Sequence, residues 1–154
     1  MKSHNKRLII RQFDKKLQGL SPLLTMEHPK AGWINLLRTT LNMSLRQLGQ
    51  RLDVTPQGVK KIETSEAEGS IALKSLREAA DALGMKLVYG FVPKDGSLEK
   101  MIEKRAAEMA GKIVTRTSTT MKLEDQENSG QRIKDAIAEM TEELKKEMPK
   151  TLWD

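Results

Sequence analysis

Hydrophobic residues recur every three or four positions along most of this chain, which is the pattern of amphipathic helices. The pattern covers residues 5–20, 32–42, 71–83, 97–113 and 133–148. Residues 21–30 contain two prolines and no periodicity, so we expect a linker there. In the helix expected at 32–42, Trp33, Leu36, Leu37 and Leu41 are expected to form the buried stripe. The pattern predicts a mainly α fold.

Residues 44–63 predict two short helices joined by a tight turn at 53–54. Ser44 is placed to cap the first helix, and Gln47 completes a capping box. Thr55 is placed to cap the second helix, in which Pro56 takes the first position. The buried pattern of the pair comprises Leu45, Leu48, Leu52, Val54, Val59 and Ile62. With this spacing a protein lays a helix in the major groove of DNA. We therefore predict a helix-turn-helix bundle.

Three further segments carry structural expectations. The run TSEAEGS after Ile62 predicts an acidic loop. The run MKLVYGFVP at residues 85–93 is rich in β-formers and predicts a short strand. A lone strand exposes an unpaired edge, so we expect it to dimerise the protein by pairing with a second copy. Two-fold symmetry would place two recognition helices on a palindromic operator.

The chain after Pro93 predicts two appended helices. The first begins at Ser97 and is expected to end or kink near Thr115–Thr120, since Thr and Ser compete for backbone hydrogen bonds. An interruption follows at 128–130, and the last helix is stopped by Pro149. The predicted organisation is a basic N-terminal helix and linker at 1–30, a helix-turn-helix domain with its C-terminal strand at 31–95, and a helical tail at 96–154.

Charge is distributed unevenly. The net charge is +6, and residues 1–64 hold 12 Lys and Arg residues against 4 Asp and Glu residues. A basic excess of this kind favours a polyanionic partner, although solvated lysine-rich faces are the ordinary explanation of a charge run. Only two Trp, one Tyr and two Phe residues are present, which argues against a base-stacking surface for single strands.

Sequence features of catalysis and secretion are scarce. The chain has no cysteine, no apolar run of 18 residues and no cleavable leader pattern at its beginning, so we expect a cytoplasmic protein with no membrane association. His4 and His28 have no metal-ligand spacing, and no Gly-rich phosphate loop or G-x-S-x-G motif occurs. We therefore expect no enzyme, no cofactor and no metal site.

The two-helix unit supplies the predicted DNA contacts. Gln57 can pair with adenine, Lys60 and Lys61 can reach guanine edges or phosphates, and Gly58 leaves room for close approach. Hydroxyls and cations near helix N-termini suit phosphate oxygens. The complete predicted set is Ser44, Arg46, Thr55, Gln57, Gly58, Lys60, Lys61, Thr64 and Lys74. The alternative is a generic helical hairpin with solvated lysines.

The run SLRQLGQRLDVTPQGVKKIE followed by SIALKSLREAADALG resembles the lambda-repressor-like, XRE-type helix-turn-helix domain. The family's turn glycine is Asp53 in this chain, and its frequent first-position glutamines are Leu45 and Pro56. These departures put base contacts at Leu45 and Pro56 in doubt and move the expected base reading to Gln57, Lys60 and Lys61.

A second resemblance extends over most of the chain. The runs GWINLLRTTLNMSLRQLGQRL, TSEAEGSIALKSLREAADALGMKLVYGFVP, SLEKMIEKRA, TMKLEDQ and LWD resemble the group called mobile mystery protein A. That group is named for mobile-element contexts and is similar to regulators encoded beside a Fic-domain partner. The resemblance implies a DNA-binding repressor of its own operon, or an antitoxin. LVYGFVP likewise resembles the dimerising strand of some antitoxin-type regulators.

The expected protein partner has two candidate sites. Thr64, Glu68 and Gly69 fit the T-x-x-x-E-G motif that restrains Fic enzymes, although an exposed acidic turn is the ordinary explanation. The helices between 97 and 148 carry a methionine-rich stripe, which can adapt to a foreign surface. Ordinary core packing of that stripe is the alternative. An antitoxin-type interaction protein is therefore the second functional hypothesis.

Overall fold

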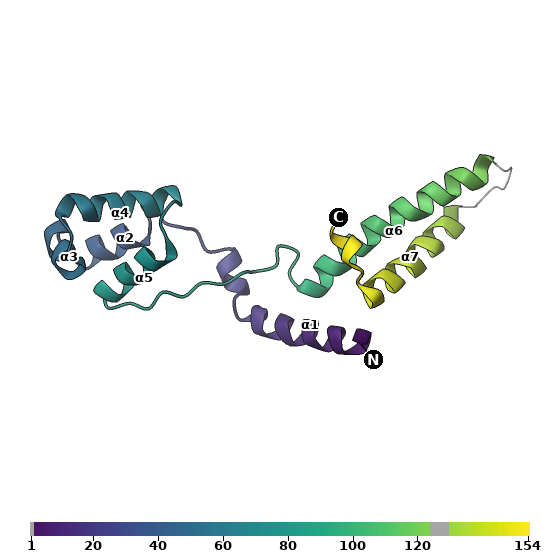
Figure 1. The fold of residues 1–154 in the computed structure, drawn as a ribbon, viewed down its shortest axis with the longest axis horizontal. Helices are drawn as coiled ribbons and strands as arrows, with labels where there is room; N and C mark the ends of the chain where they lie inside the picture. Colours follow the sequence, from purple (N-terminus) through teal and green to yellow (C-terminus); the bar gives the residue numbers. More distant parts are fainter. Residues whose placement is uncertain (1, 124–129) are drawn as a thin grey trace. The chain divides into compact units, whose positions relative to one another are not determined.

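The computed structural model describes residues 2–123 and 130–154, and within these ranges it forms seven α-helices and two short 3-10 helices (Figure 1). The expectation of a mainly α fold is confirmed. The chain divides into two compact units. The central unit is Met26–Gly90, and the terminal unit combines the segment before Met26 with Phe91–Asp154. The expected interruption at 128–130 lies mostly outside the described residues.

The central unit packs four short helices around one core. They are α2 (Trp33–Thr40), α3 (Leu45–Leu52), α4 (Pro56–Glu68) and α5 (Leu73–Ala82). The buried side chains are those of Ile34, Leu48, Val59, Ala79 and Leu83. The stripe expected on α2 is wrong in part, because Trp33, Leu36 and Leu41 are exposed and Ile34 is buried instead. The inward face of α2 includes Arg38, whose charged side chain the apolar pattern could not indicate.

Helix α4 is longer than the sequence indicates. The acidic loop expected after Ile62 is wrong, because α4 continues to Glu68 and ends at Gly69 with a φ of 77°. The hydroxyls of Thr64 and Ser65 donate to the carbonyls of Lys60 and Lys61 at 2.9 and 2.8 Å. Hydroxyls bonded back to the preceding turn are compatible with the helix, which therefore runs on until a left-handed glycine stops it.

The terminal unit is built on two long helices that lie side by side, α6 (Leu98–Leu123) and α7 (Gly130–Glu147) (Figure 1). Helix α1 (Lys2–Gln18) packs against both, and η1 (Ser21–Leu24) and η2 (Lys150–Trp153) are short 3-10 turns. The core contains Ile102, Ala106, Ala110, Leu144 and Leu152. Met109, Met140 and Met148 pack against it, so part of the methionine stripe belongs to the core.

The break expected in α6 near Thr115–Thr120 is wrong, because the helix continues to Leu123. Thr117 donates its hydroxyl proton to the Ile113 carbonyl at 3.1 Å and remains helical. Where α6 begins, both oxygens of Asp14 from α1 accept backbone N–H groups, those of Leu98 at 2.7 Å and Glu99 at 3.2 Å. A carboxylate at this position satisfies unpaired donors of the first turn and complements the helix dipole.

Residues 85–93 form irregular chain and not the expected strand. A strand needs a neighbour for its N–H and C=O groups, and none pairs with this segment among the described residues. Val88, Tyr89 and Phe91 are 75%, 63% and 88% exposed. Tyr89 is held on α5, where Arg77 donates to its hydroxyl oxygen at 3.3 Å. Separately, no described helix has the length and apolar character needed to span a membrane.

Candidate nucleic-acid interface

Both helices of the α3–α4 pair begin at the residues that the sequence predicts. The Ser44 hydroxyl accepts from the Gln47 N–H at 3.1 Å, and the Ser44 N–H donates to the Gln47 side-chain oxygen at 2.8 Å. The Thr55 hydroxyl accepts from the Gly58 N–H at 3.0 Å, with Pro56 next in the chain. The capping box and the second cap are therefore confirmed, and each helix start is fixed by its own side chains.

The turn between α3 and α4 depends on two small or permissive residues. Asp53 adopts left-handed geometry, with φ 55° and ψ 42°. Aspartate tolerates this region better than most residues, so this turn forms without a glycine. At Gly49 an added Cβ would lie 2.6 Å from the Val54 carbonyl oxygen, so the turn folds back on α3 at a distance that only glycine allows.

The outer face of α4 gathers the three side chains predicted to read bases and one predicted phosphate contact, Thr64. Gln57, Lys60, Lys61 and Thr64 are exposed and recur at three- and four-residue spacing, while Val59 on the opposite side is fully buried. Residues so spaced lie on one face of a helix. Gly58 is half-buried beside this face, and its position would bring an added Cβ within 3.2 Å of the Val54 side chain. Its small size therefore serves the turn.

Beneath this face, a buried ion pair joins α4 to α2. Arg38 Nε lies 2.5 Å from Glu63 Oε1, and the two side chains are 12% and 7% exposed. Asn35 donates to the other oxygen of Glu63 at 2.9 Å, and Arg38 also donates to the Met43 carbonyl at 2.9 Å. Further along α4, Glu66 accepts the Ile34 N–H at 2.9 Å. These bonds fix the orientation of α4.

Sequence reasoning missed this polar network. Its signal was available in part, since Glu63 occupies a core-facing position four residues after Val59, where an apolar residue is expected. Sequence reasoning also gave no role to Gln50 and Arg51. Both side chains help to line an open hollow of about 450 Å³ beside α3, and Arg51 donates a hydrogen bond to the Ala82 carbonyl at 3.1 Å.

The remaining predicted DNA contacts are dispersed. Ser44 and Arg46 are exposed at the beginning of α3, Thr55 is exposed at the beginning of α4, and Lys74 is exposed on α5. The structure thus brings Gln57, Lys60, Lys61 and Thr64 together and leaves Lys74 on a different helix. The assignment of all these side chains to DNA contacts stays a prediction.

The predicted partner motif lies at the other end of the same helix. Thr64 and Glu68 are one turn apart on the outer face of α4, and Gly69 is its C-terminal cap. Glu68 is exposed and places a negative charge at the end of this face. The motif is therefore part of an ordered helix end and is separate from the terminal unit.

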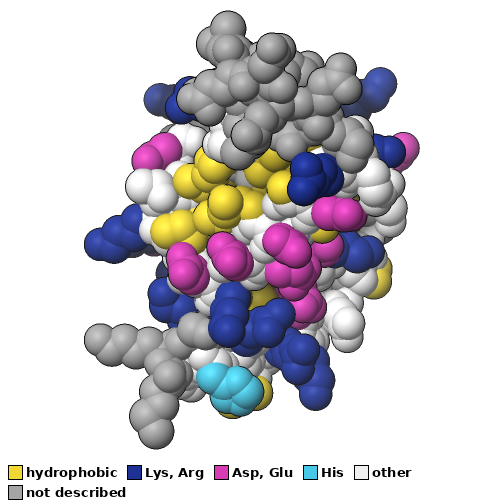
Figure 2. Space-filling view, turned by 90° about the vertical axis from the view of Figure 1, so that its right-hand side faces the viewer, with side chains coloured by type: hydrophobic (Ala, Val, Ile, Leu, Met, Phe, Trp, Pro, Cys, Tyr) yellow, Lys and Arg dark blue, Asp and Glu magenta, His cyan; other side chains and the backbone are white. Residues whose placement is uncertain are grey.

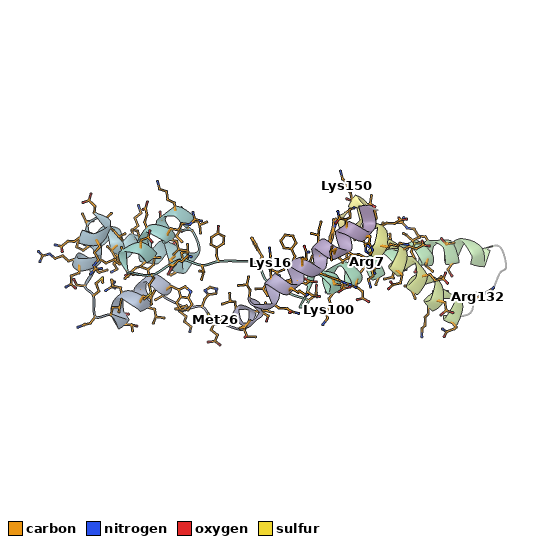
Figure 3. All side chains as sticks on the ribbon, turned by 90° about the horizontal axis from the view of Figure 1, so that it is seen from below. Arg7, Lys16, Met26, Lys100, Arg132 and Lys150 are labelled. Atoms are coloured by element: carbon orange, nitrogen blue, oxygen red, sulfur yellow. The ribbon has the colours of Figure 1, made fainter. Side chains whose placement is uncertain are left out.

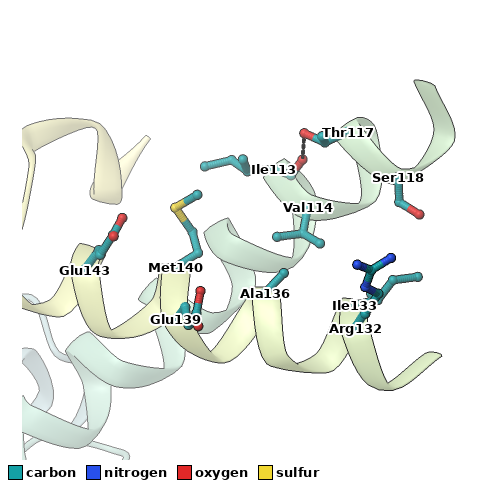
Figure 4. A pocket seen from close by; sticks show the side chains of 10 residues that line it. All are labelled: Ile113, Val114, Thr117, Ser118, Arg132, Ile133, Ala136, Glu139, Met140 and Glu143. Carbon is teal, nitrogen blue, oxygen red and sulfur yellow. Dashed lines mark hydrogen bonds between the residues drawn. The ribbon is translucent and has the colours of Figure 1, made fainter. Parts of the chain in front are cut away.

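The terminal unit has a different kind of surface, an open groove of about 440 Å³ between α6 and α7 (Figure 4). Apolar side chains line most of it, namely Ile113, Val114, Ile133, Ala136 and Met140. Glu139 and Glu143 lie along its α7 side. In the space-filling view a patch of hydrophobic side chains adjoins several acidic ones, with basic side chains nearby (Figure 2). Arg132, Thr117 and Ser118 complete the lining, so the groove is an apolar surface whose border carries two carboxylates and one guanidinium group.

The geometry of the central unit defines a helix-turn-helix domain, with two capped helices, a tight turn and one polar outer face on the second helix. In agreement with this, residues 34–89 match the helix-turn-helix family model. The match supports a DNA-binding transcription regulator of the XRE type. No curated protein and no solved structure matches the chain. Residues before 34 and after 89 lie outside the matched region.

Proposed function

We propose that this protein is a sequence-specific DNA-binding transcription regulator that represses its own operon. The observation that carries the proposal is the outer face of α4, where an exposed amide and two exposed ammonium groups project from a helix held rigidly at both its start and its inner side. Gln57 has the chemistry to pair with adenine in the major groove, and Lys60 and Lys61 can contact guanine or phosphate.

The helix starts supply the contacts that set register on the duplex. The exposed Arg46 and the hydroxyls of Ser44 and Thr55 lie at the N-terminal ends of α3 and α4. Phosphate oxygens bind favourably there because the helix dipole and free N–H groups attract negative charge. Lys74 and Thr64 are weaker phosphate contacts in this scheme.

In the proposed repressor, residues 85–93 form the dimer contact. Their exposed Val88, Tyr89 and Phe91 would be covered when two copies pair their segments as antiparallel strands. The pairing would also satisfy backbone groups that have no strand partner in one chain. A two-fold dimer of this kind matches an operator made of two inverted half-sites.

The first experiment titrates the protein on DNA from upstream of its own gene and on random DNA of equal length, at two salt concentrations. Stronger binding to its own upstream DNA that weakens with salt supports the proposal, since each neutralised phosphate releases bound counterions. Failure to bind either DNA at low salt contradicts it.

Two substitutions separate the roles on α4. Gln57→Ala is expected to weaken the specific complex by about 1 to 3 kcal/mol and to relax one base position. Lys60→Ala is expected to weaken binding to all sequences more evenly. Gln12→Ala and Lys112→Ala, at exposed positions in the terminal unit, serve as controls. Equal losses for Gln57→Ala on specific and random DNA would contradict its role in base reading.

The second candidate function is an antitoxin-type interaction protein that binds a Fic-domain partner. The groove between α6 and α7 favours it, because an apolar groove between two helices suits the apolar face of an amphipathic helix, and Glu139 and Glu143 on the α7 side can meet basic side chains of that helix (Figure 4). Ile133→Lys in the groove, at a position outside the core of the terminal unit, would abolish capture of a co-expressed partner, while Glu68→Ala would do so if the α4 motif is used. Retained capture in both variants contradicts this function.

A further inference from the structure

Helix α1 is strongly cationic and lies outside the region that matches the family model. Its 17 residues include six Lys and Arg side chains and a single acidic one, Asp14. Arg7, Arg11 and Lys15 follow one another at intervals of four residues, and all three are exposed. Figure 3 labels Arg7 and Lys16 on this helix. Positions four apart are neighbours on a helix surface, so these three cations form one stripe. Each lies about 6 Å further along the helix axis than the one before it.

The stripe has no compensating charge of its own. Both oxygens of Asp14 accept N–H groups of α6, so the only carboxylate of α1 is engaged in capping. In the part of the chain that the structure describes, Arg7, Arg11 and Lys15 form no ion pair. Cations elsewhere in the same unit do so, as in Lys104–Asp95, Arg105–Glu108 and Lys145–Glu142. Like charges one turn apart repel, and a polyanion would relieve that repulsion.

The hollow beside the stripe does not neutralise it. Arg7 and Arg11 line a small depression together with Ile10 and Ile102, one carboxylate and one ammonium group. The carboxylate is that of Glu99 on α6 and the ammonium group is that of Lys145 on α7. Lys145 is already paired with Glu142 and Glu103. Glu99 is therefore the one carboxylate in this lining that faces the stripe, and against three cations it leaves positive charge in excess.

We propose that the stripe Arg7, Arg11 and Lys15 is a second DNA-contacting surface that binds backbone phosphates without reading sequence. This inference rests on the proposed DNA-binding function and extends it to the terminal unit. Arginine forks suit phosphate oxygens, and rows of cations account for most sequence-independent binding to DNA. Because the two units belong to one chain, the second contact becomes intramolecular once α4 is bound.

An anionic membrane is the other polyanion that a basic amphipathic helix can bind, but the packing of α1 disfavours it. Such a helix inserts its apolar face into the lipid. In α1 the centre of that face is already used, since Ile10 packs against the core of the terminal unit and Leu17 is half-buried. Leu8, Ile9 and Phe13 remain exposed, but none of them is at the centre of the packed face. The cationic stripe is therefore more available than the apolar face.

The test compares two triple variants of the full chain that remove the same charge. Arg7→Gln with Arg11→Gln and Lys15→Gln removes the stripe. Lys100→Gln with Lys112→Gln and Lys134→Gln removes three exposed lysines from α6 and α7. Each protein is titrated on its own upstream DNA and on random DNA over a range of salt, and folding is checked by circular dichroism.

The stripe variant is expected to lower the slope of log affinity against log salt by about 2 to 3, at roughly 0.9 per lost phosphate contact. The control variant should lower it by less than about 1. The ratio of affinities for the two DNAs should stay unchanged, because phosphate contacts carry no sequence information. Arg7→Lys with Arg11→Lys, which keeps the charge, should retain the wild-type slope.

Three outcomes would overturn the inference. If wild type binds its upstream DNA and the stripe variant has the same slope as wild type, the stripe does not contact DNA although the proposed function stands. If both triple variants lower the slope of log affinity against log salt by the same amount, the change reflects the lower total charge of the protein and not a contact made by the stripe. If wild type binds neither DNA, the proposed function and the stripe contact fail together. In each case binding to vesicles with 30% anionic lipid then tests the membrane as the partner.

Discussion

The two units are both helical, but different side chains hold them together. The central unit packs four short helices around Leu48 and Val59 and adds a buried ion pair between Arg38 and Glu63. The terminal unit packs long helices through Ala106 and Ala110, both fully buried. Short helices have little length over which to fix their angle, so directional bonds orient them. Long helices with small contact residues approach closely and are oriented by extended packing.

This difference matters for function because only the central unit must hold one helix face in a defined pose. A helix that reads base edges has to keep its side chains within hydrogen-bonding distance of the groove. The polar network under α4 meets that requirement, since bonds from Asn35 and Arg38 converge on Glu63. The cationic stripe of α1 has a looser requirement, because phosphate contacts depend mainly on charge.

The first prediction, with the largest expected effect, tests whether the buried ion pair stabilises the central unit by removing one of its partners. Arg38→Met leaves the Glu63 carboxylate buried without its cation and is expected to destabilise the central unit by about 3 to 5 kcal/mol. The two tryptophans permit a separate readout, since Trp33 lies in the central unit and Trp153 in the terminal unit. Urea unfolding followed by Trp33 fluorescence in a Trp153→Phe background measures the loss.

The control for this prediction is the double variant Arg38→Met with Glu63→Leu. Replacing both charges with apolar side chains removes the unpaired group and should recover most of the stability. Trp153 fluorescence in a Trp33→Phe background should change little in either variant. A loss below about 1 kcal/mol for Arg38→Met would mean that water reaches Glu63 and that the pair behaves as a surface contact.

The second prediction concerns the close approach between α3 and the turn that leads into α4. Gly49→Ala places a methyl group where only 2.6 Å separates it from the Val54 carbonyl oxygen. We expect a loss of about 1 to 3 kcal/mol in the central unit, because backbone must move to relieve the contact. Trp33 fluorescence measures this loss, and DNA binding should fall with it. Unchanged stability would mean that the turn relaxes freely and does not set the angle of α4.

The sequence predicted the elements that depend on local chemistry. The caps at Ser44 and Thr55 and the turn at Asp53 follow from side-chain hydrogen bonds and backbone preference, and the structure has them where expected. The α3–α4 pair and the outer face of α4 could therefore be predicted from the sequence alone. The end of α4 was not, because hydroxyl side chains in TSEAE are compatible with either a helix or a loop.

Features that depend on contacts between residues far apart in the sequence could not be predicted from the sequence. The ion pair joins residues 25 positions apart, and Asp14 caps a helix that begins 84 residues later. Periodicity assigns apolar faces but does not identify which charged side chains turn inward. The strand expected at 85–93 depended on a pairing partner outside the single chain, so its β-rich composition did not determine its structure here.

The third prediction tests the cap that joins α1 to α6. Asp14→Ala removes the acceptor for two N–H groups at the beginning of α6 and should destabilise the terminal unit by about 0.5 to 2 kcal/mol. Unfolding followed by Trp153 fluorescence in the Trp33→Phe background measures it. Asp95→Ala, which removes an exposed partner of Lys104, is the control and should cost less than about 0.5 kcal/mol. Equal effects would contradict a capping role for Asp14.

The fourth prediction has the smallest expected effect: a glycine-to-alanine substitution should stabilise the terminal unit, whereas the same substitution destabilises the central unit. Gly111 lies within α6, and an added Cβ there would meet no other atom within 4 Å. Gly111→Ala should therefore stabilise the terminal unit by about 0.5 to 1 kcal/mol, because alanine loses less backbone entropy in a helix. The same substitution at Gly49 destabilises the central unit through a clash. A loss at Gly111, measured by Trp153 fluorescence, would show that α6 needs glycine there, as expected if a partner approaches its backbone closely.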